Sequence, residues 1–71
     1  MILLAEINIS YSRHAQQRKT QKGISDTEVK RAIQRGAKKI QENNIILASF
    51  SDLKIVYIKK DGIYYIITIM D

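Results

Sequence analysis

The chain has 71 residues, which is enough for one domain with a single hydrophobic core but not for two. It contains no cysteine and one histidine, so disulfide frameworks and metal sites built from thiolates or several histidines are excluded. The formal net charge is +5, and residues 12–39 hold nine lysines and arginines against two acidic residues. This concentration of charge favours a polyanionic partner, nucleic acid above all; a solvated helical surface is the alternative.

The apolar opening of the chain, residues 1–5, is followed by Glu6 and Asn8 and is too short for a signal-peptide core or a membrane span. We therefore expect a cytoplasmic protein that does not enter a membrane. The sequence has no proline and no low-complexity linker, and nothing in it marks a domain boundary. Residues 1–71 are expected to fold as one domain.

In the N-terminal half, residues 2–9 alternate between apolar and polar side chains and predict a short strand. Two helices follow. The first is expected to start after the N-cap Ser12 and to end at Gly23. The second starts with the capping box Ser25-Asp26-Thr27-Glu28, presents an apolar stripe at helical spacing, and ends at Gly36.

After Gly36 the pattern changes to β-strands rich in isoleucine, valine and tyrosine. Four antiparallel strands are predicted, at residues 37–42, 45–50, 53–60 and 63–70. Two-residue loops are expected at Asn43-Asn44, Ser51-Asp52 and Asp61-Gly62. If Asp61-Gly62 closes the last hairpin, Tyr57 lies opposite Ile66 and Ile55 lies opposite Thr68.

The predicted fold class is α+β, with a short N-terminal strand and two short helices packed on a four-stranded antiparallel β-meander. Both faces of the last hairpin are rich in apolar residues, so neither is expected to be simply solvated. The helices can cover one face. The other would remain for a homodimer, a protein partner or a nucleic acid.

The first helix is unusual because Ala15 is its only apolar residue. His14 and Arg18 are four residues apart and share one side of it. A histidine can act as general acid or base near neutral pH, and an arginine can bind a phosphate. The alternative is a histidine satisfied by the sheet beneath it and a surface arginine.

Several segments resemble one group of proteins: Tyr11-Ser12-Arg13-His14-Ala15-Gln16-Gln17-Arg18, then Lys22-Gly23-Ile24-Ser25, then the closing strand Ile66-Ile67-Thr68-Ile69. The chain is similar to small prokaryotic domains of unknown function that carry an H-A-x-x-R helix. These domains are grouped with the RelE-like and barnase-like superfamily of ribonuclease toxins. The resemblance spans nearly the whole chain and implies a RelE-like fold.

The resemblance also implies a toxin-like, metal-independent endoribonuclease in which the ribose 2′-hydroxyl attacks the adjacent phosphate. His14 would be the acid or base, Arg18 would bind the phosphate, and Thr68 would position a phosphate or hold His14. No cofactor and no metal are implied. The partners expected are RNA, a protein of the antitoxin type, and a second copy of the chain.

Further residues are assigned to nucleic-acid binding by their chemistry: Arg13, Lys19, Lys22, Lys54, Tyr57 and Tyr64. Several of these residues, and Thr68 as well, have a structural alternative. The tyrosines suit cross-strand packing, Lys54 suits a surface position that discourages strand addition, and Thr68 suits a strand because it is β-branched. A binding module without catalysis, for nucleic acid or for a protein, is the competing function.

Overall fold

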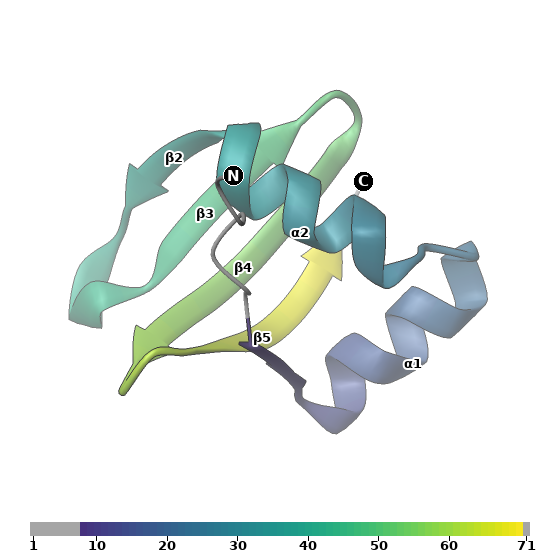
Figure 1. Ribbon diagram of the computed structural model, residues 1–71, viewed down its shortest axis with the longest axis horizontal. Helices are drawn as coiled ribbons and strands as arrows, with labels where there is room; N and C mark the ends of the chain where they lie inside the picture. The colour runs from purple at the N-terminus through teal and green to yellow at the C-terminus, as the bar shows by residue number, and fades with distance from the viewer. Residues whose placement is uncertain (1–7, 71) are drawn as a thin grey trace, which may run out of the picture.

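The computed structural model describes residues 8–70, which form two α-helices, one short 3₁₀ turn and five strands (Figure 1). In chain order the elements are β1 (Asn8–Tyr11), α1 (Arg13–Lys22), α2 (Asp26–Arg35), β2 (Ala37–Ile40), the 3₁₀ turn η1 (Glu42–Asn44), β3 (Ile46–Phe50), β4 (Leu53–Lys60) and β5 (Ile63–Met70). Most of the predicted strand at 2–9 lies outside the described residues. Within residues 8–70, neither helix is long and apolar enough to cross a membrane.

Both helices begin and end at the residues that their capping signals predict. The Ser12 side chain accepts a hydrogen bond from the Ala15 amide, and Gly23 ends α1 in the left-handed conformation, with φ of 64°. Both hydrogen bonds of the capping box are present between Ser25 and Glu28 at the start of α2. These local interactions satisfy amide groups that a helix start leaves without partners.

The strand predictions are confirmed for β4 and β5 to the residue. The turn between them has φ of 53° at Asp61 and 77° at Gly62, which is the left-handed conformation expected of a tight hairpin. The first hairpin is wider than predicted. Its strands are last paired at Ile40 and Ile46, and Asn43 and Asn44 take positive φ within a longer loop.

The sheet differs from the predicted four-stranded antiparallel meander, because it has five strands in the order β1-β5-β4-β3-β2 and is mixed. The strand β1 runs parallel to β5, with Ile9 beside Tyr64 and Tyr11 beside Ile66. The physical reason is that Ile9 and Tyr11 continue the apolar surface of the sheet next to the first half of β5. The finer RelE-like assignment remains a prediction.

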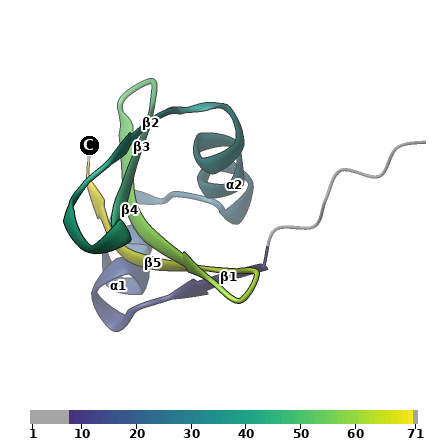
Figure 2. The same ribbon diagram turned by 90° about the vertical axis from the view of Figure 1, so that its left-hand side faces the viewer.

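The two helices occupy different places around the sheet. In Figure 2, α2 lies on one side of the sheet, whereas α1 lies beside β5 near the plane of the strands. The core forms between α2 and the sheet from ten buried residues: Ala15, Ile24, Val29, Ala32, Ile33, Ala48, Ile55, Tyr57, Ile66 and Ile69. Among the described elements, no helix covers the opposite face of the sheet.

The predicted register of the last hairpin is correct near its turn and wrong beyond Ile66. Tyr57 pairs with Ile66 as expected, but Val56 pairs with Thr68 and Ile55 with Ile69. The reason is a β-bulge that leaves Ile67 as an extra residue on β5. After the bulge, Ile69 points into the core and Thr68 points to the uncovered face, which reverses the two positions predicted from simple alternation.

Gly36 joins α2 to β2 where two backbone segments come close together. A Cβ atom at this position would lie against the carbonyl oxygen of Ala32 and 2.7 Å from that of Ser49. Neither backbone atom can move without disturbing α2 or β3. Close approach, and not an unusual φ, therefore requires glycine here.

We predict that Gly36→Ala lowers the free energy of unfolding by about 1–3 kcal/mol, because overpacked backbone contacts must be relieved. Urea denaturation followed by circular dichroism would measure this change. Gln34→Ala, at an exposed position on α2, is the matched control and should shift stability by less than about 0.5 kcal/mol. Equal stability of the two variants would show that the junction has room for a side chain.

Candidate functional site

Helix α1 is docked along the second half of β5, where β1 has ended. The Ser12 amide donates to the Ile66 carbonyl at 2.9 Å, and the Ser12 hydroxyl donates to the Ile67 carbonyl at 2.7 Å. One and a half turns later, Arg18 Nε donates to the Ile69 carbonyl at 3.3 Å. The start of α1 thus binds carbonyl groups of β5 that a further strand would otherwise pair with.

This docking lays α1, which carries His14 and Arg18, along the part of β5 that contains Thr68. Thr68 lies between the two carbonyls that Ser12 and Arg18 bind, and His14 lies between Ser12 and Arg18 along the helix. We call His14, Arg18 and Thr68 the β5 margin. The three residues were predicted from separate positions in the sequence, and their joint role stays a prediction.

The β5 margin belongs to the uncovered side of the sheet. On α1, Lys19 faces Asp26 of α2, whereas His14 and Arg18 lie on the other flank of the buried Ala15. Thr68 pairs with Val56 and therefore points away from α2, because the neighbouring Ile55 is buried beneath that helix. All three side chains are thus directed away from the core.

The chemistry of the three groups differs. His14 is exposed in the first turn of α1. Arg18 is half-buried. Among residues 8–70, its Nε group donates a hydrogen bond to the Ile69 carbonyl. The two terminal amino groups of its guanidinium can still donate to an anion. Thr68 is half-buried and offers a hydroxyl. The described residues contain no group of three histidine, cysteine, aspartate or glutamate side chains that could hold a metal.

The residues assigned to nucleic-acid binding are distributed over different parts of the molecule. Arg13 is exposed at the start of α1, and Lys54 is exposed on the uncovered side of the sheet. Lys22 is half-buried at the end of α1. The sequence assignment therefore does not describe one continuous surface.

Two of the predicted tyrosines are in contact on the α2 side of the sheet. Tyr57 is only 2% exposed, and its ring centre lies 5.4 Å from that of the half-buried Tyr64. Lys59 Nζ lies 5.2 Å from the Tyr64 ring centre. Burial, and secondarily the neighbouring Tyr64, raises the pKa of Tyr57. In the free protein these rings serve packing, and a base-stacking role remains a prediction.

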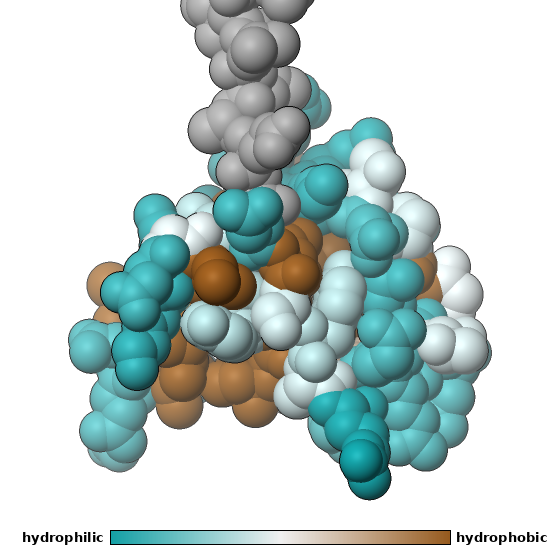
Figure 3. Space-filling model, turned by 60° about the horizontal axis from the view of Figure 1, so that its bottom comes forward, coloured by the Kyte–Doolittle hydropathy of each residue, from teal (hydrophilic) through white to brown (hydrophobic). Residues whose placement is uncertain are grey.

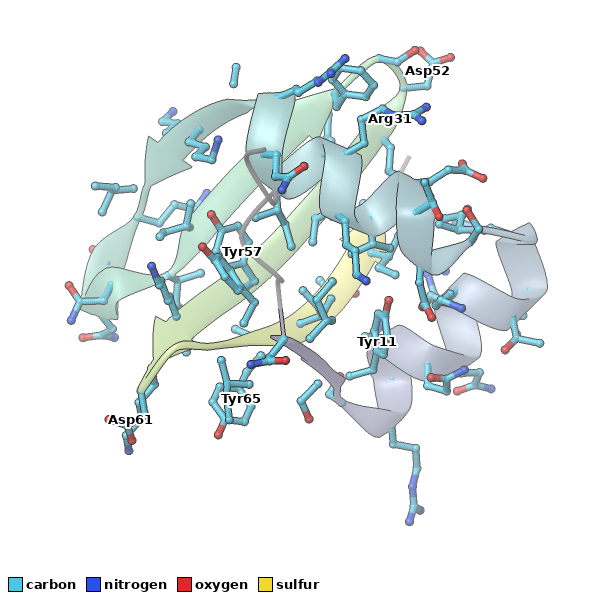
Figure 4. The ribbon with its side chains drawn as sticks, in the orientation of Figure 1. Tyr11, Arg31, Asp52, Tyr57, Asp61 and Tyr65 are labelled. Carbon is cyan, nitrogen blue, oxygen red and sulfur yellow. The ribbon has the colours of Figure 1, made fainter. Side chains whose placement is uncertain are left out.

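Sequence reasoning missed a polar cluster that joins β1, α1 and α2. Tyr11 points from the end of β1 toward α2 (Figure 4), and its hydroxyl donates to Asp26 Oδ1 at 2.7 Å. Lys19 Nζ lies 3.2 Å from the same oxygen and 5.5 Å from the Tyr11 ring centre. Lys19, assigned to nucleic acid from its charge, is therefore already paired and only 17% exposed.

The electrostatics of this cluster follow from its geometry. Burial, and then the bond to Asp26, raises the pKa of Tyr11. The hydrogen bond from Tyr11, followed by that from Lys19, lowers the pKa of Asp26 below its ordinary value of 3.8. The sequence does show Tyr11 just before the cap of α1 and Asp26 in the first turn of α2. Their hydrogen bond could not be predicted from it, because the pairing depends on the angle between the two helices.

A separate pocket of ≈ 490 Å³ lies between α2 and the β3–β4 hairpin, with Ile24, Phe50 and Leu53 as its apolar lining. Arg31 and Asp52 lie near one another at its edge (Figure 4). Both acidic and basic side chains line it, so it has no single charge preference. It contains none of the residues of the β5 margin.

Comparison of the chain with protein-family models, with curated proteins and with solved structures finds no match in any of the three.

We predict that Ser12→Ala lowers the free energy of unfolding by about 1–2 kcal/mol, because it removes both the cap of α1 and the bond to Ile67. Urea denaturation would measure the loss. Ser25→Ala removes the cap of α2 alone and separates ordinary capping from the docking of α1. A cost for Ser12→Ala no greater than that for Ser25→Ala would contradict a docking role.

We predict that Asp26→Asn lowers the melting temperature at pH 7 and that this difference disappears in acid. The folded-state pKa of Asp26 is depressed, so its stabilisation is fully present above pH 3.8 and is lost as the pH falls through the folded-state value. Thermal melts between pH 7 and about pH 2 would check this, with Asp52→Asn as the control. A difference that persists in acid would place the effect elsewhere.

Proposed function

We propose that the β5 margin binds and cleaves RNA without a metal, as a toxin-like endoribonuclease, with His14 as the acid or base. The observation that supports this proposal is that α1, which carries His14 and Arg18, is held by Ser12 and Arg18 against the part of β5 that contains Thr68. An exposed histidine beside a guanidinium and a hydroxyl is a set that can act on a phosphodiester.

Each group would have a distinct task in the reaction. In its neutral form His14 takes the proton from a ribose 2′-hydroxyl, and the 2′-oxygen attacks the adjacent phosphorus. The bond from phosphorus to the 5′-oxygen breaks, and water protonates the leaving oxygen. The products are a 2′,3′-cyclic phosphate and a 5′-hydroxyl. Negative charge grows on the phosphate oxygens during this step, and the terminal amino groups of Arg18 would stabilise it.

Arg18 is held by the sheet through one part of its guanidinium and could bind a phosphate through the rest, which supports its proposed role. Its Nε group is bound to the Ile69 carbonyl, so the plane of the guanidinium is oriented before any phosphate arrives. A side chain that is already ordered loses less conformational entropy on binding. Thr68, next to that carbonyl in β5, would donate its hydroxyl to the same phosphate.

Surrounding positive charge would attract the RNA strand. Arg13 is exposed beside His14, and Lys54 is exposed on the same uncovered side as Thr68. Lysine and arginine contacts to phosphates release counterions, so binding would weaken steeply with added salt.

We predict that the protein cleaves generic single-stranded RNA in the presence of a metal chelator and that His14→Ala reduces the rate by at least about 100-fold. Denaturing gel electrophoresis over a range of pH values would give the rates, and end-group analysis would detect the cyclic phosphate. Gln34→Ala, an exposed change on α2, should cleave as the wild type does.

Circular dichroism of the same samples would establish that each variant is folded. Cleavage by folded His14→Ala at the wild-type rate would remove the proposed role of that residue. Folded wild-type protein that binds RNA in a salt-dependent way without cleaving it would favour the non-catalytic binding module.

A further inference from the structure

The face of the sheet away from α2 is apolar, and no described helix covers it. Strand pairing and alternation place six apolar residues on it: Leu47, Val56, Ile58, Ile63, Tyr65 and Met70. Tyr65 is 41% exposed and Met70 is 37% exposed, and the other four are half-buried. Figure 3, which views the molecule from below, shows apolar side chains reaching the surface between hydrophilic ones. A contiguous apolar surface of this kind marks an interaction site.

The charged side chains that the strands place on this face are all of one sign. Lys39 pairs across from Leu47, Lys54 from Met70 and Lys60 from Ile63, so three lysines lie around the apolar residues. The acidic residues within 8–70 belong to α2, to η1 and to the hairpin turns. The strands therefore present an apolar centre with a positive rim.

This combination selects among possible occupants. A second copy of the chain would bring one positive rim against another, and like charges across an interface are unfavourable. Nucleic-acid bases stack on flat aromatic rings, and Tyr65 is the one aromatic residue among the six. An acidic segment with an apolar side satisfies both the centre and the rim.

We infer that the uncovered face binds an amphipathic, acidic helix of a partner protein. The opposite face is already covered in this way, by the apolar stripe of α2 with its charged residues turned outward. Lys54 and Lys60 are six positions apart on β4 and therefore separated by about 20 Å. A helix that follows β4 rises about 1.5 Å per residue, so carboxylates about 14 positions apart are separated by about this distance, lie on the same side of the helix and can meet both lysines.

The test uses a designed probe: an 18-residue helical peptide with leucines along one side and, beside them, two glutamates 14 positions apart. The control peptide carries lysines in place of those glutamates. Fluorescence anisotropy with the full-length protein should show binding that is at least tenfold tighter for the acidic peptide. The double variant Lys54→Glu/Lys60→Glu should reverse this preference. Lys30→Glu/Arg35→Glu, the same charge change on α2, should keep it.

A second pair of variants tests the apolar centre. Ile58→Thr/Tyr65→Thr keeps residues that favour strands and should weaken binding of the acidic peptide at least tenfold, with the fold checked by circular dichroism. Ile40→Thr is the control, because Ile40 is 74% exposed on β2 and pairs with Ile46 on the α2 side. Binding of this probe is measured without RNA, so the result is independent of ribonuclease activity.

The inference is overturned if the acidic peptide does not bind or if both peptides bind equally. It is also overturned if sedimentation shows a dimer that Ile58→Thr/Tyr65→Thr abolishes, since the occupant is then a second copy. Loss of RNA binding in that variant, with peptide binding unchanged, would make the face a nucleic-acid platform.

Discussion

Most of the arrangement described above depends on the contact between Ser12 and the bulged part of β5. One residue caps α1 through its hydroxyl oxygen and donates that same hydroxyl's proton to the Ile67 carbonyl. Its amide binds the Ile66 carbonyl at the point where β1 ends. The bulge gives β5 an extra residue, and the carbonyls around it are bound by α1 because no strand lies there. The position of α1 therefore depends on the same bulge that sets the register of β5 and the direction of the Thr68 side chain.

The bulge also divides the side chains of β5 between the two faces. Ile66 and Ile69 are both buried although they are three residues apart, a spacing that an unbroken strand does not allow. Ile69 completes the core beneath α2, and Thr68 is turned to the other face, one residue before the carbonyl that Arg18 binds. The core and the candidate site thus depend on the same irregularity. In a regular strand that keeps Ile66 buried, Thr68 would turn toward the core and Ile69 away from it.

Local sequence signals were sufficient for the caps of both helices, the Asp61-Gly62 turn and the extents of β4 and β5, because each depends on residues close together in the chain. The bulge at Ile67 and the parallel pairing of β1 were missed, since both depend on contacts between distant segments. The set His14, Arg18 and Thr68 was proposed from spacing and resemblance and stays a prediction, whereas the backbone bond of Arg18 could not be foreseen from the sequence. The ring of Tyr57 looked available in the sequence and is buried in the structure.

The way in which α1 is held has a consequence for motion. Ala15 is its one fully buried side chain, whereas α2 buries Val29, Ala32 and Ile33. Polar contacts, among them those of Ser12, Arg18 and Lys19, also hold it. Local opening costs less free energy where little apolar surface is buried, so α1 separates from β5 more readily than α2 leaves the sheet. Amide protons of α1 should consequently exchange with solvent faster than those of α2, and the β5 margin assembles and disperses with this helix.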